Sequence, residues 1–99
     1  MDVSLARAQL LLEQSRYDLA EQELHRALGA NPGLAMAHSL LAICHVERER
    51  YDDATREARE AIVLDPELPY AHYVHALVLQ RRRRNDEALR AAAEALALD

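Results

Sequence analysis

The sequence predicts an all-α protein, an α-solenoid of three helix-turn-helix units. Three observations predict it: a 34-residue period runs through all 99 residues without a gap, each period holds two stretches of apolar residues at helical spacing, and the chain has only two Gly and three Pro. Internal periods of about 20–50 residues are typical of stacked units that bury their apolar faces against one another. We therefore expect one domain with repeats over 1–34, 35–68 and 69–99, and six antiparallel helices in a right-handed superhelix.

The period is clearest at the turn inside each repeat. Three motifs align there: Tyr17-Asp18-Leu19-Ala20, Tyr51-Asp52-Asp53-Ala54 and Asn85-Asp86-Glu87-Ala88. Alanine also recurs in three sets: Ala8, Ala42 and Ala76; Ala20, Ala54 and Ala88; Ala27, Ala61 and Ala95. A side chain larger than a methyl group would push closely crossing helices apart. We therefore expect these alanines to lie at helix crossings.

The first repeat predicts two helices. Helical apolar spacing begins near the amino terminus and gives way to the polar stretch 13–16. In the second helix, Asp18 is placed to cap the amino end, with Glu21 as its capping-box partner. Asn31-Pro32 ends that helix, because proline disfavours a helical conformation in the residue before it.

The second repeat predicts helices over about 35–48 and 53–64, with a turn at Arg50-Tyr51 and a stop at Asp65-Pro66.

In the third repeat, Pro69 suits the first turn of a fifth helix and Asp86 opens a sixth. Leu89, Leu96 and Leu98 lie where a seventh helix would pack. We expect the chain to be an excerpt of a longer array, or its uncapped end to be covered by self-association.

Composition excludes several functions. A formal net charge of −5 argues against nucleic acid, whose phosphates need a basic face. No apolar run approaches the ~20 residues of a membrane span, and the chain does not begin like a signal peptide. Cys44 is the single cysteine. We expect a cytoplasmic protein with no direct membrane insertion. All twelve basic residues are Arg, which we interpret as the codon usage of a GC-rich, bacterial genome.

These features resemble the tetratricopeptide repeat family over the whole chain. The repeat length, the spacing of Ala8, Ala20, Ala27 and Pro32, and the Tyr-Asp-x-Ala turn match its consensus. The chain departs from the family pattern at three positions of the repeat, none of which threatens the fold. The family's Trp is replaced by Ser4, His38 and His72, and its Gly is replaced by Ala8, Ala42 and Ala76. Its Tyr is replaced by Leu11, His45 and Leu79. The resemblance implies a scaffold that binds a peptide or partner protein in its concave groove, without catalysis or a cofactor.

The resemblance places this groove on the first helix of each repeat. The lining residues carried over are Leu5, Gln9 and Leu12; Met36, Ser39, Ile43, Val46 and Glu47; Tyr70, Tyr73, Leu77 and Arg81. Contiguous apolar exposure marks an interaction site, so an apolar or amphipathic segment of a partner fits it. The alternative is that several of these residues pack against neighbouring helices.

Some family members hold the acidic tail of a chaperone through a clamp of cations and amides. The matching positions here carry no cation: Leu5, Gln9, Leu40, Tyr70 and Val74. This argues against recognition of that tail.

Two other constellations favour structural interpretations. His72 and His75 share a helix face and Cys44-His45 adds possible ligands, but the spacing is not that of a zinc site, so we expect packed imidazoles and no metal. The run 81–84 of four Arg falls at a helix carboxyl end, where cations complement the helix dipole, and we expect a solvated rim. No catalytic motif is present, so we do not expect an enzyme.

Two functional hypotheses remain. The first is an adaptor whose groove captures an unidentified protein or peptide. The second is a homo-oligomerisation or structural module of a larger multi-domain protein, paired through its groove or its open end.

Overall fold

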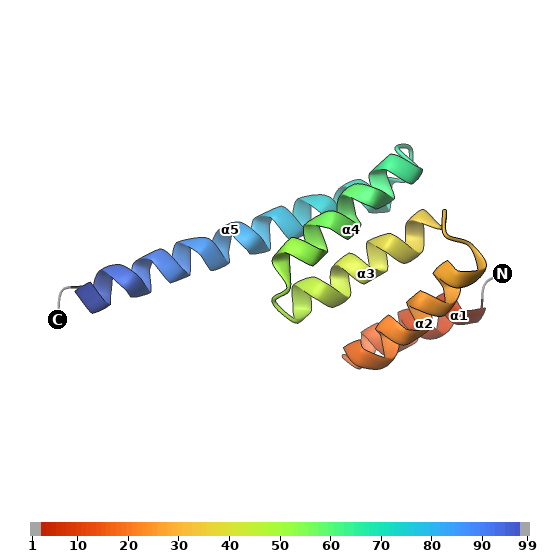
Figure 1. Cartoon of the computed structure of the whole chain (residues 1–99), viewed down its shortest axis with the longest axis horizontal. Coiled ribbons are helices and arrows are strands. Elements are labelled where there is room, and N and C mark those ends of the chain that lie inside the picture. Colours follow the sequence, from red (N-terminus) through yellow and green to blue (C-terminus); the bar gives the residue numbers. More distant parts are fainter. Residues whose placement is uncertain (1–2, 98–99) are drawn as a thin grey trace.

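The computed structural model describes residues 3–97 and confirms the all-α class. Its helices are α1 (Val3–Glu13), α2 (Tyr17–Ala30), α3 (Ala35–Glu47), α4 (Tyr51–Leu64) and α5 (Pro69–Ala97), and this span contains no strand. α1 pairs with α2 and α3 with α4, while the first half of α5 packs on the second pair (Figure 1). The rest of α5, which we call the arm (residues 85–97), continues past the α3–α4 turn. Leu98 lies outside the described residues.

The first two repeats make their internal turn in the same way. Ser15 and Glu49, which are equivalent positions, adopt left-handed backbone conformations with φ of 59° and 60°. In both turns the next residue's N–H donates to the carbonyl five positions back, at 2.8 Å. This pattern is a Schellman motif, which satisfies the last carbonyls of a helix and reverses the chain.

The predicted turn of the third repeat is wrong. Arg83, the equivalent of Ser15 and Glu49, is helical, and α5 runs through the expected break at Asn85-Asp86 as one 29-residue helix. Residues 81–97 contain no Gly or Pro and consist mostly of Ala, Leu, Arg and Glu, the best helix formers. The Arg83 Nε also lies 3.0 Å from the Glu87 Oε1, an ion pair that spans the expected break. The described residues therefore form five helices and not six.

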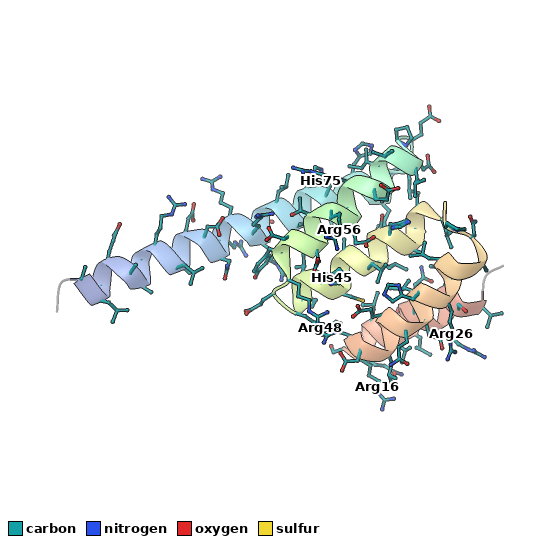
Figure 2. All side chains as sticks on the ribbon, viewed as in Figure 1. Arg16, Arg26, His45, Arg48, Arg56 and His75 are labelled. Carbon is teal, nitrogen blue, oxygen red and sulfur yellow. The ribbon has the colours of Figure 1, made fainter. Side chains whose placement is uncertain are left out.

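The predicted capping by Asp18 is also wrong. α2 begins at Tyr17, so its N-cap residue is Arg16, two residues before Asp18, and no side chain among the described residues caps this end. The Asp18 carboxylate instead lies 2.8 Å from Arg48, at the α3–α4 turn (Figure 2). Asp18 therefore forms an ion pair with the next repeat and does not cap its own helix.

Arginine braces join successive repeats at the same register. Arg48 contacts Asp18, and its Nη1 lies 2.9 Å from Glu21. One period later, Arg82 donates to Asp52 at 2.5 Å and to Thr55 Oγ1 at 3.0 Å. The predicted solvated rim at 81–84 is thus partly structural.

The histidines that replace the family's early Trp close the turns between repeats. His38 Nε2 lies 3.1 Å from the Pro32 carbonyl, and His72 Nε2 lies 2.7 Å from the Pro66 carbonyl. Because a carbonyl can only accept, Nε2 is the donor to the carbonyl in both rings. Glu57 of α4 contacts the other nitrogen of His38 at 2.7 Å. These imidazoles therefore act in packing and turn closure.

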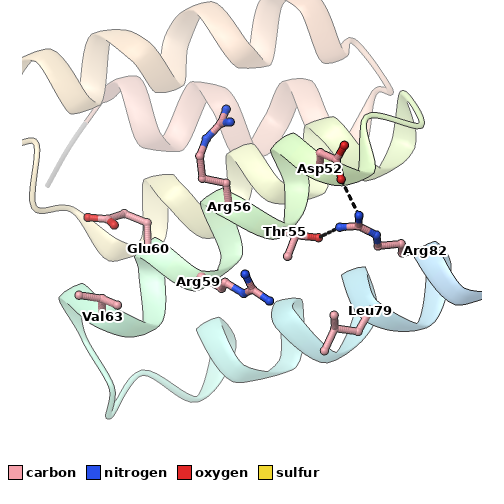
Figure 3. A pocket seen from close by; sticks show the side chains of 8 residues that line it. All are labelled: Asp52, Thr55, Arg56, Arg59, Glu60, Val63, Leu79 and Arg82. Carbon is pink, nitrogen blue, oxygen red and sulfur yellow. Dashed lines mark hydrogen bonds and ion pairs between the residues drawn. The ribbon is translucent and has the colours of Figure 1, made fainter.

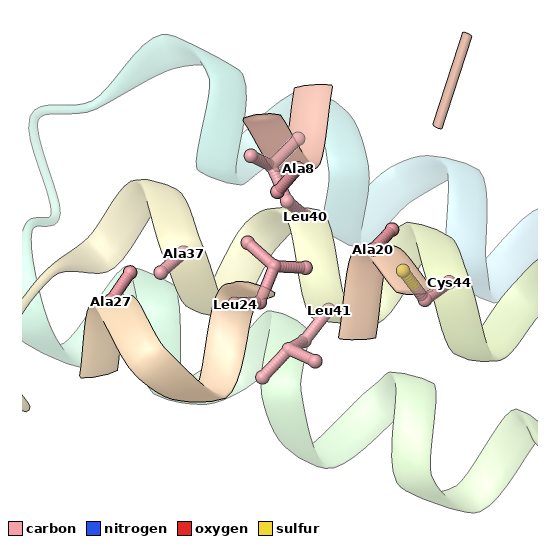
Figure 4. Packing of buried hydrophobic residues seen from close by; sticks show 8 residues of the cluster. All are labelled: Ala8, Ala20, Leu24, Ala27, Ala37, Leu40, Leu41 and Cys44. Carbon is pink, nitrogen blue, oxygen red and sulfur yellow. The ribbon is translucent and has the colours of Figure 1, made fainter. Parts of the chain in front are cut away.

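The core consists of two clusters that share α3. Figure 4 shows the first, formed by α1, α2 and α3: Ala8, Ala20, Leu24, Ala27, Ala37, Leu40, Leu41 and Cys44. The second joins α3, α4 and α5: Ala42, Val46, Ala54, Ala58, Val74 and Val78. The predicted alanine crossings are confirmed in the first two repeats, where all six alanines are at most 1% exposed. In the third they are wrong, since the straight α5 leaves Ala76, Ala88 and Ala95 exposed.

Candidate functional site

The first helices of the three repeats lie side by side and form an open groove. α3 contacts both α1 and α5, so each repeat contributes one helix to a continuous face. The groove has a volume of about 620 Å³. It is lined by Gln9, Leu12, Glu13, Met36, Leu40, Ile43 and Tyr70. Its floor is apolar and its polar residues come from α1.

Five of the twelve residues predicted for the groove line it: Gln9, Leu12, Met36, Ile43 and Tyr70. Two others, Glu47 of α3 and Arg81 of α5, contact each other at 3.5 Å. Glu13, Glu47 and Arg81 are equivalent positions, so the last turns of the first helices carry a row of charges. This row gives the groove a polar end.

Tyr70 and Tyr73 form an aromatic pair on α5. Their ring centroids are 6.0 Å apart with an interplanar angle of 29°. Tyr70 packs against both core clusters, whereas Tyr73 is 61% exposed. Burial, with a smaller contribution from Tyr73, raises the pKa of Tyr70. Tyr70 is therefore a fixed, neutral wall of the groove.

Two predicted lining residues are in the interior instead. Ser39 and Val46 are 0% and 2% exposed, because α3 is the central helix and is covered from both sides. Leu5 packs against the first core cluster, and Leu77 is half-buried. Conversely, Leu40 was missing from the predicted lining. Its spacing between Met36 and Ile43, one turn from each, was the signal that would have placed it there.

The buried titratable groups do not form a reactive centre. Burial raises the pKa of the Cys44 thiol to about 12, so this thiol is a poor nucleophile. Burial lowers the pKa of His45. Within residues 3–97, no group of three or more His, Cys, Asp or Glu side chains is placed to hold a metal ion. Nor is any helix of this span long and apolar enough to cross a membrane.

Paired helices in a repeating register, with a groove across their first members, define a helical-repeat scaffold. The chain matches the sequence profile of the tetratricopeptide repeat over residues 5–69, which is more than half of it. The protein therefore belongs to the tetratricopeptide repeat family, a family of non-catalytic protein-interaction modules. The match begins within α1, covers α2 to α4 and stops at the first residue of α5. No curated protein matches the chain.

Proposed function

We propose that this protein is an interaction scaffold that holds an apolar or amphipathic segment of a partner protein in the groove across α1, α3 and α5. One observation carries the proposal: an open groove of about 620 Å³ whose floor includes Leu12, Met36, Ile43 and Tyr70. A groove of this size lies within the range of ligand sites, about 300–1,000 Å³. A Met adapts to different apolar surfaces, and a fixed Tyr provides a rigid contact.

The charges around the groove indicate which residues its ligand would carry. Glu13 lines it at the carboxyl end of α1, and the Glu47–Arg81 pair occupies the equivalent turns of α3 and α5. A helical ligand that places apolar residues at every third or fourth position would contact the floor. A cationic residue at the end of this ligand would pair with Glu13.

The test is a selection of amphipathic helical peptides from a displayed library, followed by titration against two matched variants. Gln9→Arg places a long cation in the groove, whereas Gln22→Arg makes the same change on α2, away from it; both glutamines are exposed. We expect Gln9→Arg to weaken binding at least tenfold and Gln22→Arg to leave it unchanged. Selected peptides that bind both variants equally would overturn the groove assignment.

A second candidate is a self-associating structural module. Its supporting observation is the exposure of large apolar residues on α5: Leu79, Leu89 and Leu96 are 44%, 63% and 74% exposed. Light scattering over a range of concentrations tests it. A mass that stays at 11.2 kDa excludes self-association. A dimer that Leu96→Glu dissociates supports it.

A further inference from the structure

The surface between α4 and the first half of α5 is an open, charged pocket of about 710 Å³ (Figure 3). Three arginines line it in a chain whose net charge is −5: Arg56, Arg59 and Arg82. Its apolar lining residues are Val63, which is 74% exposed, and Leu79, which is 44% exposed. The pocket shares no lining residue with the groove across α1, α3 and α5. It is therefore a separate surface.

A pocket of about 410 Å³ lies at the same place one repeat earlier, between α2 and α3. It is lined by Asp18, Glu21, Gln22, His25 and Arg48. The equivalents of these five residues all line the pocket between α4 and α5: Asp52, Thr55, Arg56, Arg59 and Arg82. One acid is thus replaced by a neutral residue, and a Gln and a His are replaced by arginines. Carboxylates outnumber arginines in the earlier pocket, whereas arginines outnumber carboxylates in the later one.

The arginines of the two braces differ in how far they are neutralised. Arg48, in the earlier pocket, lies between the carboxylates of Asp18 and Glu21. Arg82, in the later one, donates to a single carboxylate, that of Asp52, and to the neutral hydroxyl of Thr55. The later pocket therefore keeps positive charge that the earlier pocket cancels.

Arg59 is the cation that remains available. Arg56, one turn earlier on α4, is paired with Asp53 at 2.8 Å. Arg59 forms no ion pair with any of the described residues, and its side chain is exposed. Figure 3 shows this side chain extending from α4 toward α5. Its guanidinium is thus free to donate to a ligand in the pocket.

We propose that the pocket between α4 and α5 binds an acidic segment of a partner protein. One carboxylate of this segment pairs with Arg59, because a guanidinium presents two parallel N–H groups to a carboxylate. A neighbouring apolar side chain of the segment covers Val63 and Leu79. Asp52 and Glu60 also line the pocket and repel a polyanion, so a single carboxylate suits it better than a phosphate dianion or a nucleic acid. The proposal does not rest on the groove, whose ligand we expect to carry a cation.

Nuclear magnetic resonance of the isotopically labelled full chain tests the proposal, with a short, end-blocked peptide of alternating glutamate and leucine as the probe. We expect saturable shifts of amide signals on α4 and the first half of α5. Arg59→Gln should weaken binding about tenfold, the effect of one charge-assisted hydrogen bond. Arg90→Gln removes the same charge from an exposed position on the arm and should leave binding unchanged.

A second variant uses the earlier repeat as its template. The double substitution Arg56→Gln and Arg59→His gives both exposed positions the residues of the earlier pocket, and it should abolish binding at pH 8. Three changes of probe complete the test: glutamine in place of glutamate, serine in place of leucine, and inorganic phosphate alone. Each should bind at least about tenfold more weakly than the first peptide.

Four results would overturn the proposal. They are no saturable shifts with the first peptide, shifts confined to the groove, equal losses in Arg59→Gln and Arg90→Gln, and binding of any changed probe as tight as that of the first peptide.

Discussion

His45 offers a substitution that should stabilise the protein. Its imidazole is 8% exposed in α3, and its Nδ1 is buried without a hydrogen-bond partner among the described residues. A buried polar atom left unpaired costs about 1–3 kcal/mol. The equivalent residues Leu11 and Leu79 are leucine, so this helix position accepts that side chain. We expect His45→Leu to raise the free energy of unfolding by about 1–2 kcal/mol at pH 8, and the melting temperature by about 4–8 °C per kcal/mol.

The gain should grow as the pH falls. Burial lowers the pKa of His45 below its ordinary 6.5, and the nearby carboxylates of Glu21, Asp53 and Glu57 oppose this shift without cancelling it. The unfolded chain therefore binds the proton at a higher pH than the folded one. The free energy of unfolding of the wild type therefore does not depend on His45 protonation above pH 6.5, and it decreases as the pH falls from 6.5 toward the folded-state pKa. Leucine does not titrate, so the variant does not lose stability in this way.

Urea unfolding followed by circular dichroism, at pH 8 and at pH 5.5, measures both effects. His25→Leu is the control, because the His25 side chain is 63% exposed on α2 and its replacement should change stability little at either pH. A His45→Leu variant less stable than the wild type at pH 8 would refute the cost assigned to Nδ1. A stability difference that is the same at both pH values would refute the role of protonation.

Three further predictions concern packing, braces and reactivity. Leu24→Ala removes a fully buried side chain of the first core cluster and should cost about 3 kcal/mol in denaturant unfolding, whereas Leu19→Ala, at a 44% exposed position, should cost less than about 0.5 kcal/mol. Arg48→Met removes the brace to Asp18 and Glu21 and should cost about 1 kcal/mol at low salt; a loss unchanged in 1 M salt would contradict an electrostatic brace. Cys44, buried with its pKa raised to about 12, should react with a thiol reagent at pH 8 only as fast as the protein opens, so urea should accelerate labelling as it lowers stability.

The sequence was sufficient for most of the fold because the helix breakers recur with the period. Proline after Asn31 and Asp65, together with the apolar spacing, predicted the boundaries of α2 to α4 to within about two residues. The continuity of α5 through Arg83 was not predictable in the same way. The equivalent residues Ser15 and Glu49 make turns although neither is a glycine, so the residue at this position does not distinguish a turn from a continuous helix. The residues around Arg83 favour a continuous helix.

The groove was predictable as a face but not residue by residue. Resemblance to the family identified which helices line it, and Leu12, Met36, Ile43 and Tyr70 lie on its floor. Ser39 and Val46 are covered by neighbours on both sides of α3. Helical spacing alone cannot distinguish residues that are buried between helices from residues that line the groove, because the width of the buried face of a helix depends on how many helices pack against it.

The braces at Arg48 and Arg82 have a mechanical consequence. Each joins one repeat only to the next, and α3 is the helix of the second repeat against which α1 and α2 pack. Nearest-neighbour contacts of this kind make the array behave as a spring whose curvature changes by small rotations between units. A rotation of α1 and α2 about α3 would change the distance between Leu12 and Tyr70, which face the same groove. A ligand would therefore set the curvature of this protein as it binds, and the strength of the Arg48 brace would set the stiffness it works against.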